Sequence, residues 1–197
     1  MPMANTKNSE ENAAPSAESL VSAASRAGAR GPAPVHLWDP PYCGDLDMRI
    51  ARDGTWFHEG TPIGRERMVK LFASILKREG DRHYLVTPVE KVGITVDDAP
   101  FVAVDVSREG ADLRFVTNLG ETALAGPDHP IRVVRDADTG EPAPYVEIRS
   151  GLEALIDRKS FYRLVELGET LPHEGSDWFG VRSGGVFFPI IPAAELA

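Results

Sequence analysis

The sequence has too few cysteines for a disulfide. Cys43 is the single cysteine among 197 residues, which excludes an internal disulfide and a cysteine-based structural zinc site. Basic residues are also in the minority, with 21 Lys and Arg against 30 Asp and Glu, for a formal charge of -9. Such a surface repels a phosphate backbone, and no dense basic tract compensates for it, so duplex nucleic acid is not an expected partner. The lone cysteine fits a reducing compartment, and we expect a cytoplasmic location.

Long apolar runs are missing as well. Charges or prolines interrupt every stretch that approaches the ~20 apolar residues of a membrane-spanning helix, so no transmembrane segment is expected. Residues 1–34 contain no apolar core of a signal peptide, and they offer few large aliphatics with which to offset ordering entropy. We expect a disordered tail over residues 1–34. The alternative is a short helix over residues 13–27 that docks on a partner.

Beyond the tail, turn signals alternate with short β-rich runs. The strongest hairpin signal is Asp53-Gly54, between the runs at residues 47–51 and 55–59. A two-residue turn here gives two opposed pairs: Ala51 with Trp56, and Arg49 with His58.

A helix is predicted after this hairpin. Thr61-Pro62 is typical of an N-cap followed by the first helical residue, and Gly80 of the position just past a helix end. The apolar residues between them recur at helical spacing: Met68, Leu71, Phe72, Ile75 and Leu76. Further strands are predicted at residues 83–87, 92–96, 101–106, 113–117 and 131–135.

A similar order of elements returns near the C-terminus. A hairpin turn at Ser150-Gly151 precedes a helix over residues 160–167 and strands at 178–182 and 186–191. The sequence therefore predicts an α+β fold, rich in β-structure, with an internal duplication of a hairpin-helix-strands unit. We expect an N-terminal unit over residues 35–107 and a C-terminal unit over 108–197, each with one main helix.

Several short motifs together carry a family resemblance. They are Cys43-Gly44-Asp45-Leu46, Asp53-Gly54-Thr55-Trp56, Gly60-Thr61-Pro62-Ile63, Arg67-Met68-Val69-Lys70-Leu71-Phe72, Thr87-Pro88-Val89-Glu90-Lys91, Asp97-Asp98-Ala99-Pro100-Phe101, Thr117-Asn118, Pro144-Tyr145 and Gly151-Leu152. In combination they resemble an uncharacterised bacterial family known only as a domain of unknown function. The resemblance covers about residues 43–191. It implies a duplicated β-rich α+β fold whose C-terminal half is pleckstrin-homology-like, and a ligand site where the halves meet, for a nucleotide-like molecule in signalling.

Basic and aromatic residues supply the candidate ligand contacts. Arg67 and Lys70 lie near the predicted helix start, where a phosphate would also meet free backbone N–H groups; the alternative is a solvated helix face. Tyr145 offers a ring for stacking and Arg149 a fork for phosphate or carboxylate, against a structural salt bridge of Glu147 with an arginine. We expect Arg67, Lys70, Tyr145 and Arg149 to line one groove between the units.

The other candidates come from loops and from the first hairpin. Thr87, Glu90 and Lys91 form either a rigid loop at a cleft or a local surface ion pair. Asp98 belongs either to a ligand site or to a charged turn. The full set of predicted ligand-binding residues is Arg49, Trp56, His58, Arg67, Lys70, Thr87, Glu90, Lys91, Asp98, Asn118, Tyr145 and Arg149. No metal site and no cofactor are expected, because the five histidines are scattered without ligand spacing.

These features favour a small-ligand-binding module of signalling or regulation, which recognises an anionic, nucleotide-like molecule in the groove between its halves. One alternative is an enzyme on a nucleotide-like substrate, with Asp98, Glu90 or His83 as acid or base. The other is a protein-interaction adaptor that contacts a partner through the tail or the pleckstrin-like half. No catalytic spacing emerges from the residues, so the enzyme reading is the less favoured one.

Overall fold

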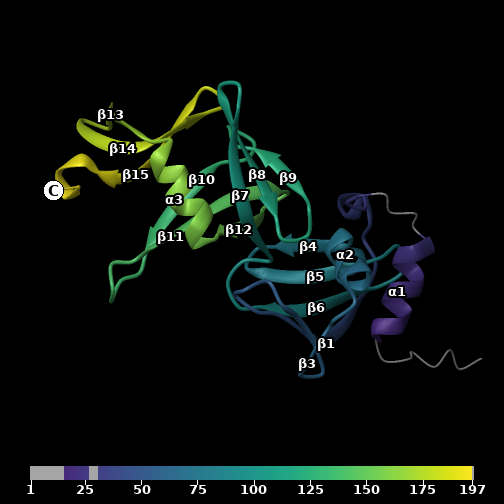
Figure 1. Ribbon diagram of the computed structural model, residues 1–197. Helices are drawn as coiled ribbons and strands as arrows, with labels where there is room; N and C mark the ends of the chain where they lie inside the picture. Colours follow the sequence, from purple (N-terminus) through teal and green to yellow (C-terminus); the bar gives the residue numbers. More distant parts are fainter. Residues whose placement is uncertain (1–15, 27–30, 197) are drawn as a thin grey trace, which may run out of the picture.

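The computed structural model describes residues 16–26 and 31–196, and Figure 1 shows their arrangement in two lobes. Within these residues, two six-stranded sheets and one three-stranded sheet account for most of the fold, with helices on their faces. The prediction of a β-rich α+β fold is confirmed. No helix in this part of the chain has the length and apolar character that crossing a membrane requires.

The first sheet follows the order β3-β2-β1-β6-β5-β4. Its strands are β1 (Tyr42–Ile50), β2 (Trp56–His58), β3 (Thr61–Pro62), β4 (Leu76–Glu79), β5 (Arg82–Val86) and β6 (Lys91–Val96). Two antiparallel meanders, β1–β3 and β4–β6, meet where β1 runs parallel to β6. The helix α2 (Glu66–Ser74) connects the two meanders.

The second sheet repeats this plan with the next six strands. Its order is β10-β11-β12-β7-β8-β9, and β7 runs parallel to β12 as β1 does to β6. Its strands are β7 (Phe101–Glu109), β8 (Asp112–Thr117), β9 (Thr122–Leu124), β10 (Ile131–Arg135), β11 (Pro142–Arg149) and β12 (Leu152–Ile156). In both sheets the first strand of six pairs with the last. The expected duplication is thus present in the strand order.

The remaining elements cover the second sheet. The helix α3 (Arg158–Glu166) packs on β7 and β14, and a small antiparallel sheet contains β13 (Glu169–His173), β14 (Ser176–Ser183) and β15 (Val186–Pro192). Short 3-10 turns occur at η1 (Val35–Leu37) and η2 (Ala193–Glu195). The helices occupy different places in the two repeats, since α2 separates the meanders whereas α3 follows the sixth strand. The pleckstrin-like character of the C-terminal half stays a prediction.

The predicted division into units 35–107 and 108–197 also stays a prediction. In the structure, β7 begins at Phe101 and pairs only with strands of the second sheet. The buried apolar residues of both sheets form one continuous cluster, which includes Trp56, Phe101 and Phe115. The two lobes therefore pack on each other through apolar contact.

The first predicted helix is shorter than expected. Its helical part is α2, while residues 61–62 form β3 and residues 76–79 form β4. Ile75 and Leu76 fit the helical spacing, but both are buried where the chain leaves the helix and pairs with β5. Gly80, with φ 59°, closes the β4–β5 hairpin and does not follow a helix end. Burial alone could not distinguish the two conformations in this short apolar run.

The first hairpin has its turn where predicted, but the expected register is wrong by one residue. Ile50 lies opposite Trp56 and Arg49 opposite Phe57. The reason is a longer turn, in which the N–H of Ala51 bonds the carbonyl of Thr55. Because strand side chains alternate between faces, this slip sends Trp56 into the core.

The expected disordered tail is contradicted for part of its length. Residues Ala17–Arg26 form α1, which packs against α2 with Leu20 fully buried, while residues 1–15 and 27–30 lie outside the described part of the chain. The Ser19 hydroxyl also donates to Glu90 at 3.1 Å. Four small or apolar residues on one helix face suffice for docking, because α2 offers a complementary apolar surface.

Candidate functional site

A cavity of about 360 Å³ lies where the two lobes meet. One wall is the exposed face of α2, and the opposite wall is the β8–β9 turn at residues 119–121. The side chains of Arg67 and Lys70 line it from α2, and Glu121 lines it from the turn. Both predicted helix residues therefore face a cavity and not only bulk solvent.

The two cations on α2 differ in their partners. Lys70 Nζ lies 2.6 Å from Glu66 Oε1, one helical turn earlier, in an exposed pair. That contact lowers the pKa of Glu66 through its hydrogen bond with Lys70. Arg67 makes no ion pair with any residue in the described ranges 16–26 and 31–196. Its guanidinium is thus the cation that an incoming anion can reach most directly.

Arg149 supports the cavity wall from behind. Its Nε donates to Glu121 at 2.8 Å, and its Nη2 donates to the carbonyl oxygen of Ala73 at 2.7 Å. A longer contact of 3.5 Å joins Nη1 to the carbonyl of Leu76. Arg149 therefore joins β11 of one lobe to the last turn of α2 in the other, where a cation interacts favourably with the helix dipole.

Tyr145 lies in a separate group of charges between the lobes. Its hydroxyl donates to Asp98 at 2.7 Å, and Asp98 also lies 3.1 Å from Arg52 Nε. The Arg132 guanidinium stacks over the Tyr145 ring at 4.2 Å and pairs with Glu153. Burial, followed by the bond to Asp98, raises the pKa of Tyr145 to about 12. This residue holds the interface and does not line the cavity beside Arg67.

The residues of the first hairpin do not reach the cavity either. Trp56 is 1% exposed and stacks on Phe72, so its ring belongs to the core. Arg49 pairs with Asp97 and lies over the Phe57 ring, on the other face of β1. His58 is half-buried on β2.

The loop candidates have structural partners. The Thr87 hydroxyl is buried and accepts from the N–H groups of Val89 and Glu90, which closes the β5–β6 turn. Glu90 accepts the hydrogen bond from α1, and Lys91 Nζ lies 3.0 Å from Glu79. Glu90 and Lys91 thus bond residues outside the loop, and the choice between a cleft loop and a local surface ion pair stays a prediction.

Asn118 connects the lobes at another point. Within the C-terminal lobe, the side-chain carbonyl of Asn118 accepts from the backbone N–H of Val102 at 3.1 Å. The backbone N–H of Asn118 donates to the carbonyl of Val102. Gly54 of the first hairpin lies against it so closely that an added Cβ would stand 2.5 Å from Asn118 Nδ2. Asn118 was predicted as a ligand contact, whereas nothing in the sequence indicated that Leu119, Gly120 and Glu121 face α2 across a cavity.

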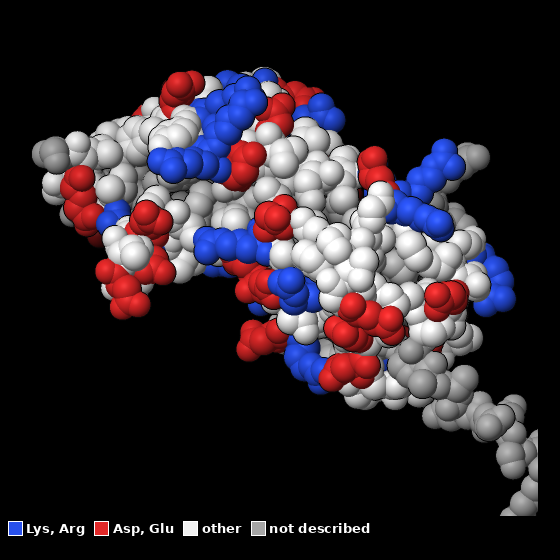
Figure 2. Space-filling view, turned by 60° about the horizontal axis from the view of Figure 1, so that its bottom comes forward, with Lys and Arg blue, Asp and Glu red and all other residues white. Residues whose placement is uncertain are grey.

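Charge is not concentrated in one patch on the face that Figure 2 shows. Basic and acidic side chains are interspersed over both lobes. This face therefore offers no extended area of one charge sign that would attract a ligand.

The family assignment rests on both halves of the chain. Residues 33–99 match the family model of the N-terminal domain of DUF1285, a domain of unknown function, and residues 100–190 match that of its C-terminal domain. The chain belongs to the DUF1285 family. The two models meet between β6 and β7, so the cavity lies between the two domains of the family.

Two crystal structures of DUF1285 family proteins are similar to the chain. The one from Silicibacter pomeroyi DSS-3 is 62% identical, with a TM-score of 0.81 over 90% of this chain and 97% of that chain. The one from Shewanella baltica OS155 is 31% identical, with a TM-score of 0.50 over 60% of this chain and 90% of that one. No curated protein matches the chain.

Proposed function

We propose that this DUF1285 protein is a regulatory binding module that takes a small anion in the cavity between its two domains. The observation that carries the proposal is Arg67, a cation without an ion-pair partner among the described residues, on the wall of a cavity that both domains form. Lys70 adds a second positive charge on the same helix face. A phosphate or carboxylate group is the natural counterpart of this pair.

The cavity favours a compact ligand. Its volume of about 360 Å³ is near the lower end for small-molecule sites, which run from roughly 300 to 1,000 Å³. Leu71 and Leu119 provide apolar contact, and no aromatic ring is among the lining residues. The expected stacking of a nucleotide base therefore lacks support here, and a phosphorylated or carboxylated metabolite fits the lining better.

The regulatory character of the proposal follows from the position of the cavity. A ligand held by Arg67 and by the β8–β9 turn would touch both domains, which already share the Arg149 contact to Ala73. Binding would add a further connection between them. Such coupling changes the stability of the domain interface without any chemical step.

The enzyme alternative gains nothing from the structure. Glu90 precedes β6 and Asp98 follows it, so the six residues of the strand, at about 3.3 Å each, hold the two carboxylates about 20 Å apart. His83 lies on β5, where burial followed by the charge of Arg78 lowers its pKa. These groups do not converge on one substrate.

Differential scanning fluorimetry with a panel of phosphates, nucleotides and small carboxylates tests the proposal. A ligand present at 100 times its Kd should stabilise the protein by about 2.7 kcal/mol. Arg67→Ala should reduce the affinity at least tenfold, and Lys70→Ala by a smaller factor, because Lys70 already pairs with Glu66.

Arg65→Ala is the matched control, because Arg65 is an exposed arginine beside the same helix that does not line the cavity. The control should bind like the wild type. The proposal fails if no compound shifts the midpoint, or if a ligand binds equally well to the Arg67 variant.

A further inference from the structure

A second cavity lies on the far side of the C-terminal domain and is almost wholly apolar. Its volume is about 230 Å³, and it lies between α3 and the small sheet. Six of its lining residues are aliphatic or aromatic: Phe161, Val165, Phe179, Ile190, Ile191 and Leu196. Apolar side chains that leave a space of this size forgo packing contacts, so an apolar occupant would stabilise the site.

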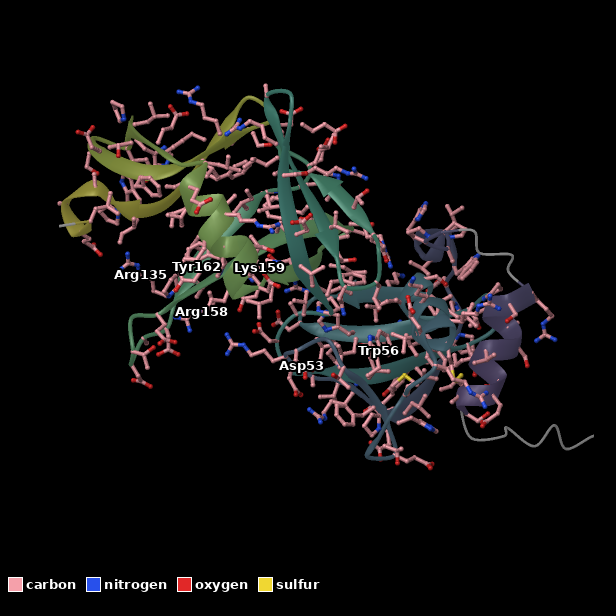
Figure 3. The ribbon with its side chains drawn as sticks, in the orientation of Figure 1. Asp53, Trp56, Arg135, Arg158, Lys159 and Tyr162 are labelled. Carbon is pink, nitrogen blue, oxygen red and sulfur yellow. The ribbon has the colours of Figure 1, made fainter. Side chains whose placement is uncertain are left out.

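This cavity adjoins an open groove of about 400 Å³ beneath the N-terminal end of α3. The two spaces share two wall residues, Pro142 of β11 and Phe161 of α3. The groove continues to Arg52, which the β1–β2 hairpin of the other domain contributes. Figure 3 shows Arg135, Arg158 and Tyr162 on one side of α3, toward the β10–β11 hairpin. The two spaces therefore lie side by side at Pro142 and Phe161, one with an apolar lining and the other with charged residues at its rim.

Arg158 is the available cation on that rim. Its guanidinium donates to the Tyr162 hydroxyl at 3.1 and 3.2 Å, and no carboxylate in the described part of the chain forms an ion pair with it. The carboxylate of Asp157 accepts from the Ser160 N–H as the cap of α3. Glu141 is the other acid on the rim. Arg52 contributes a second guanidinium, which it shares with Asp98.

The floor of the groove excludes an added β-strand. Pro142 and Pro144 have no backbone N–H, so this part of β11 cannot donate to a peptide in extended conformation. An occupant must therefore be held by side-chain contacts. At the edge of the apolar cavity, Arg135 bonds Glu195 of η2 at 2.8 Å, next to Leu196.

We propose that this composite site binds an amphipathic anion of the fatty-acid type, an unbranched aliphatic chain that ends in a carboxylate. The aliphatic chain occupies the apolar cavity and reaches the groove past Pro142 and Phe161, the two residues that line both spaces. The carboxylate pairs with Arg158, and Arg52, which lines the same groove, adds a second positive charge. The site is separate from the cavity beside Arg67, so it stands independently of the proposed function.

Isothermal titration calorimetry with the saturated acids from hexanoate to decanoate tests the proposal on the full-length protein. Each added CH₂ should tighten binding up to about fourfold as long as the cavity has room, the factor expected for burying one methylene. Decanol should bind more weakly than decanoate, because it lacks the charge that pairs with Arg158.

Variants distinguish the contact of the carboxylate with Arg158 from the contact of the aliphatic chain with the apolar cavity. Arg158→Ala should weaken decanoate at least fivefold and leave decanol unchanged. Val165→Phe narrows the apolar cavity and should weaken both, with the unfolding midpoint reported alongside. Lys159→Ala is the matched control: Lys159 is the next residue on α3, exposed, and lines neither space, so this variant should bind like the wild type.

Several outcomes would overturn the proposal. They are an absence of binding by any acid, an affinity independent of chain length, and equal losses in the Arg158 and Lys159 variants. Cosedimentation with phosphatidylglycerol vesicles that depends on Arg158, without binding of free decanoate, would assign the site to a membrane surface and overturn it too. Arg67→Ala should leave decanoate binding unchanged. A failure of the fatty-acid proposal can therefore be distinguished from a failure of the proposed anion site beside Arg67.

Discussion

Arg149 of the C-terminal domain donates a hydrogen bond to the backbone carbonyl of Ala73 in the N-terminal domain, at 2.7 Å. The same side chain pairs with Glu121, and only 16% of it is exposed. One residue thus satisfies a carbonyl at the end of α2 and a carboxylate on the β8–β9 turn. The cavity between the domains keeps its shape through this contact.

Arg149→Ala should therefore destabilise the protein by about 2–4 kcal/mol, because it leaves a half-buried carboxylate and a helix-end carbonyl without their partner. Urea unfolding followed by circular dichroism measures the loss. Arg114→Ala is the control: Arg114 is exposed on β8 with only a distant partner, 3.8 Å away, and should change stability by less than about 0.5 kcal/mol. Equal effects of the two variants would contradict the structural role of Arg149.

Gly54→Ala tests the contact between the first hairpin and Asn118. Gly54 has φ 85°, and a Cβ at this position would meet Asn118 Nδ2 at 2.5 Å and Val102 Cγ2 at 3.2 Å. Gly60, with φ 73°, shares the backbone conformation but has open space around it. Thermal unfolding should show a loss of about 1–2 kcal/mol for Gly60→Ala from the backbone alone, and about 1–3 kcal/mol more for Gly54→Ala from the clash. Equal losses in the two variants would mean that the clash with Asn118 is relieved without a loss of stability, which would contradict a tight contact between the domains.

Ionisation of Tyr145 should reduce the stability of the folded protein at alkaline pH. Its pKa is about 12 in the folded protein, raised from 10.0 by burial and by the bond to Asp98. Because the folded pKa is the higher one, the stabilisation is complete below pH 10 and is lost as pH rises toward 12, by up to about 2 kcal/mol. Denaturation between pH 9 and 12 should show this loss in the wild type and not in Tyr145→Phe. A wild type as stable at pH 12 as at pH 9 would contradict the shift.

Protonation of His83 should reduce the stability of the folded protein at acidic pH. Burial, and then the charge of Arg78, lower its pKa below 6.5, so the folded protein resists protonation that the unfolded chain accepts. Stability is therefore full above about pH 6.5 and falls as pH drops below that value. The acids with lowered pKa values, which respond only below pH 4.5, are Glu66, Glu79, Asp53 and Asp136. His83→Gln should flatten the stability profile between pH 6.5 and 4.5, and an unchanged slope would contradict the assignment.

The sequence by itself determined much of the local structure. The turns at Asp53-Gly54 and Ser150-Gly151 lie where glycine and its neighbours predict them, because their backbones need positive φ. The strands β5, β6, β8 and β10 lie within one residue of their predicted limits, since short β-branched runs between turn signals identify strands well. Arg67 and Lys70, predicted from their place near a helix start, line the cavity between the domains, and their role as ligand contacts stays a prediction.

Tertiary structure decided the rest, because it depends on contacts between residues far apart in the chain. Leu76 fits a helix and a strand equally well, and only pairing with Leu85 makes it a strand residue. Trp56 entered the core through a register shift of one residue, which turn length controls and composition does not. The parallel pairings of β1 with β6 and of β7 with β12 join strands that other strands separate in the chain, and they bring Arg149 to Ala73. A local pattern contains no trace of such pairings, so the wall that Leu119, Gly120 and Glu121 form opposite α2 could not be derived from it.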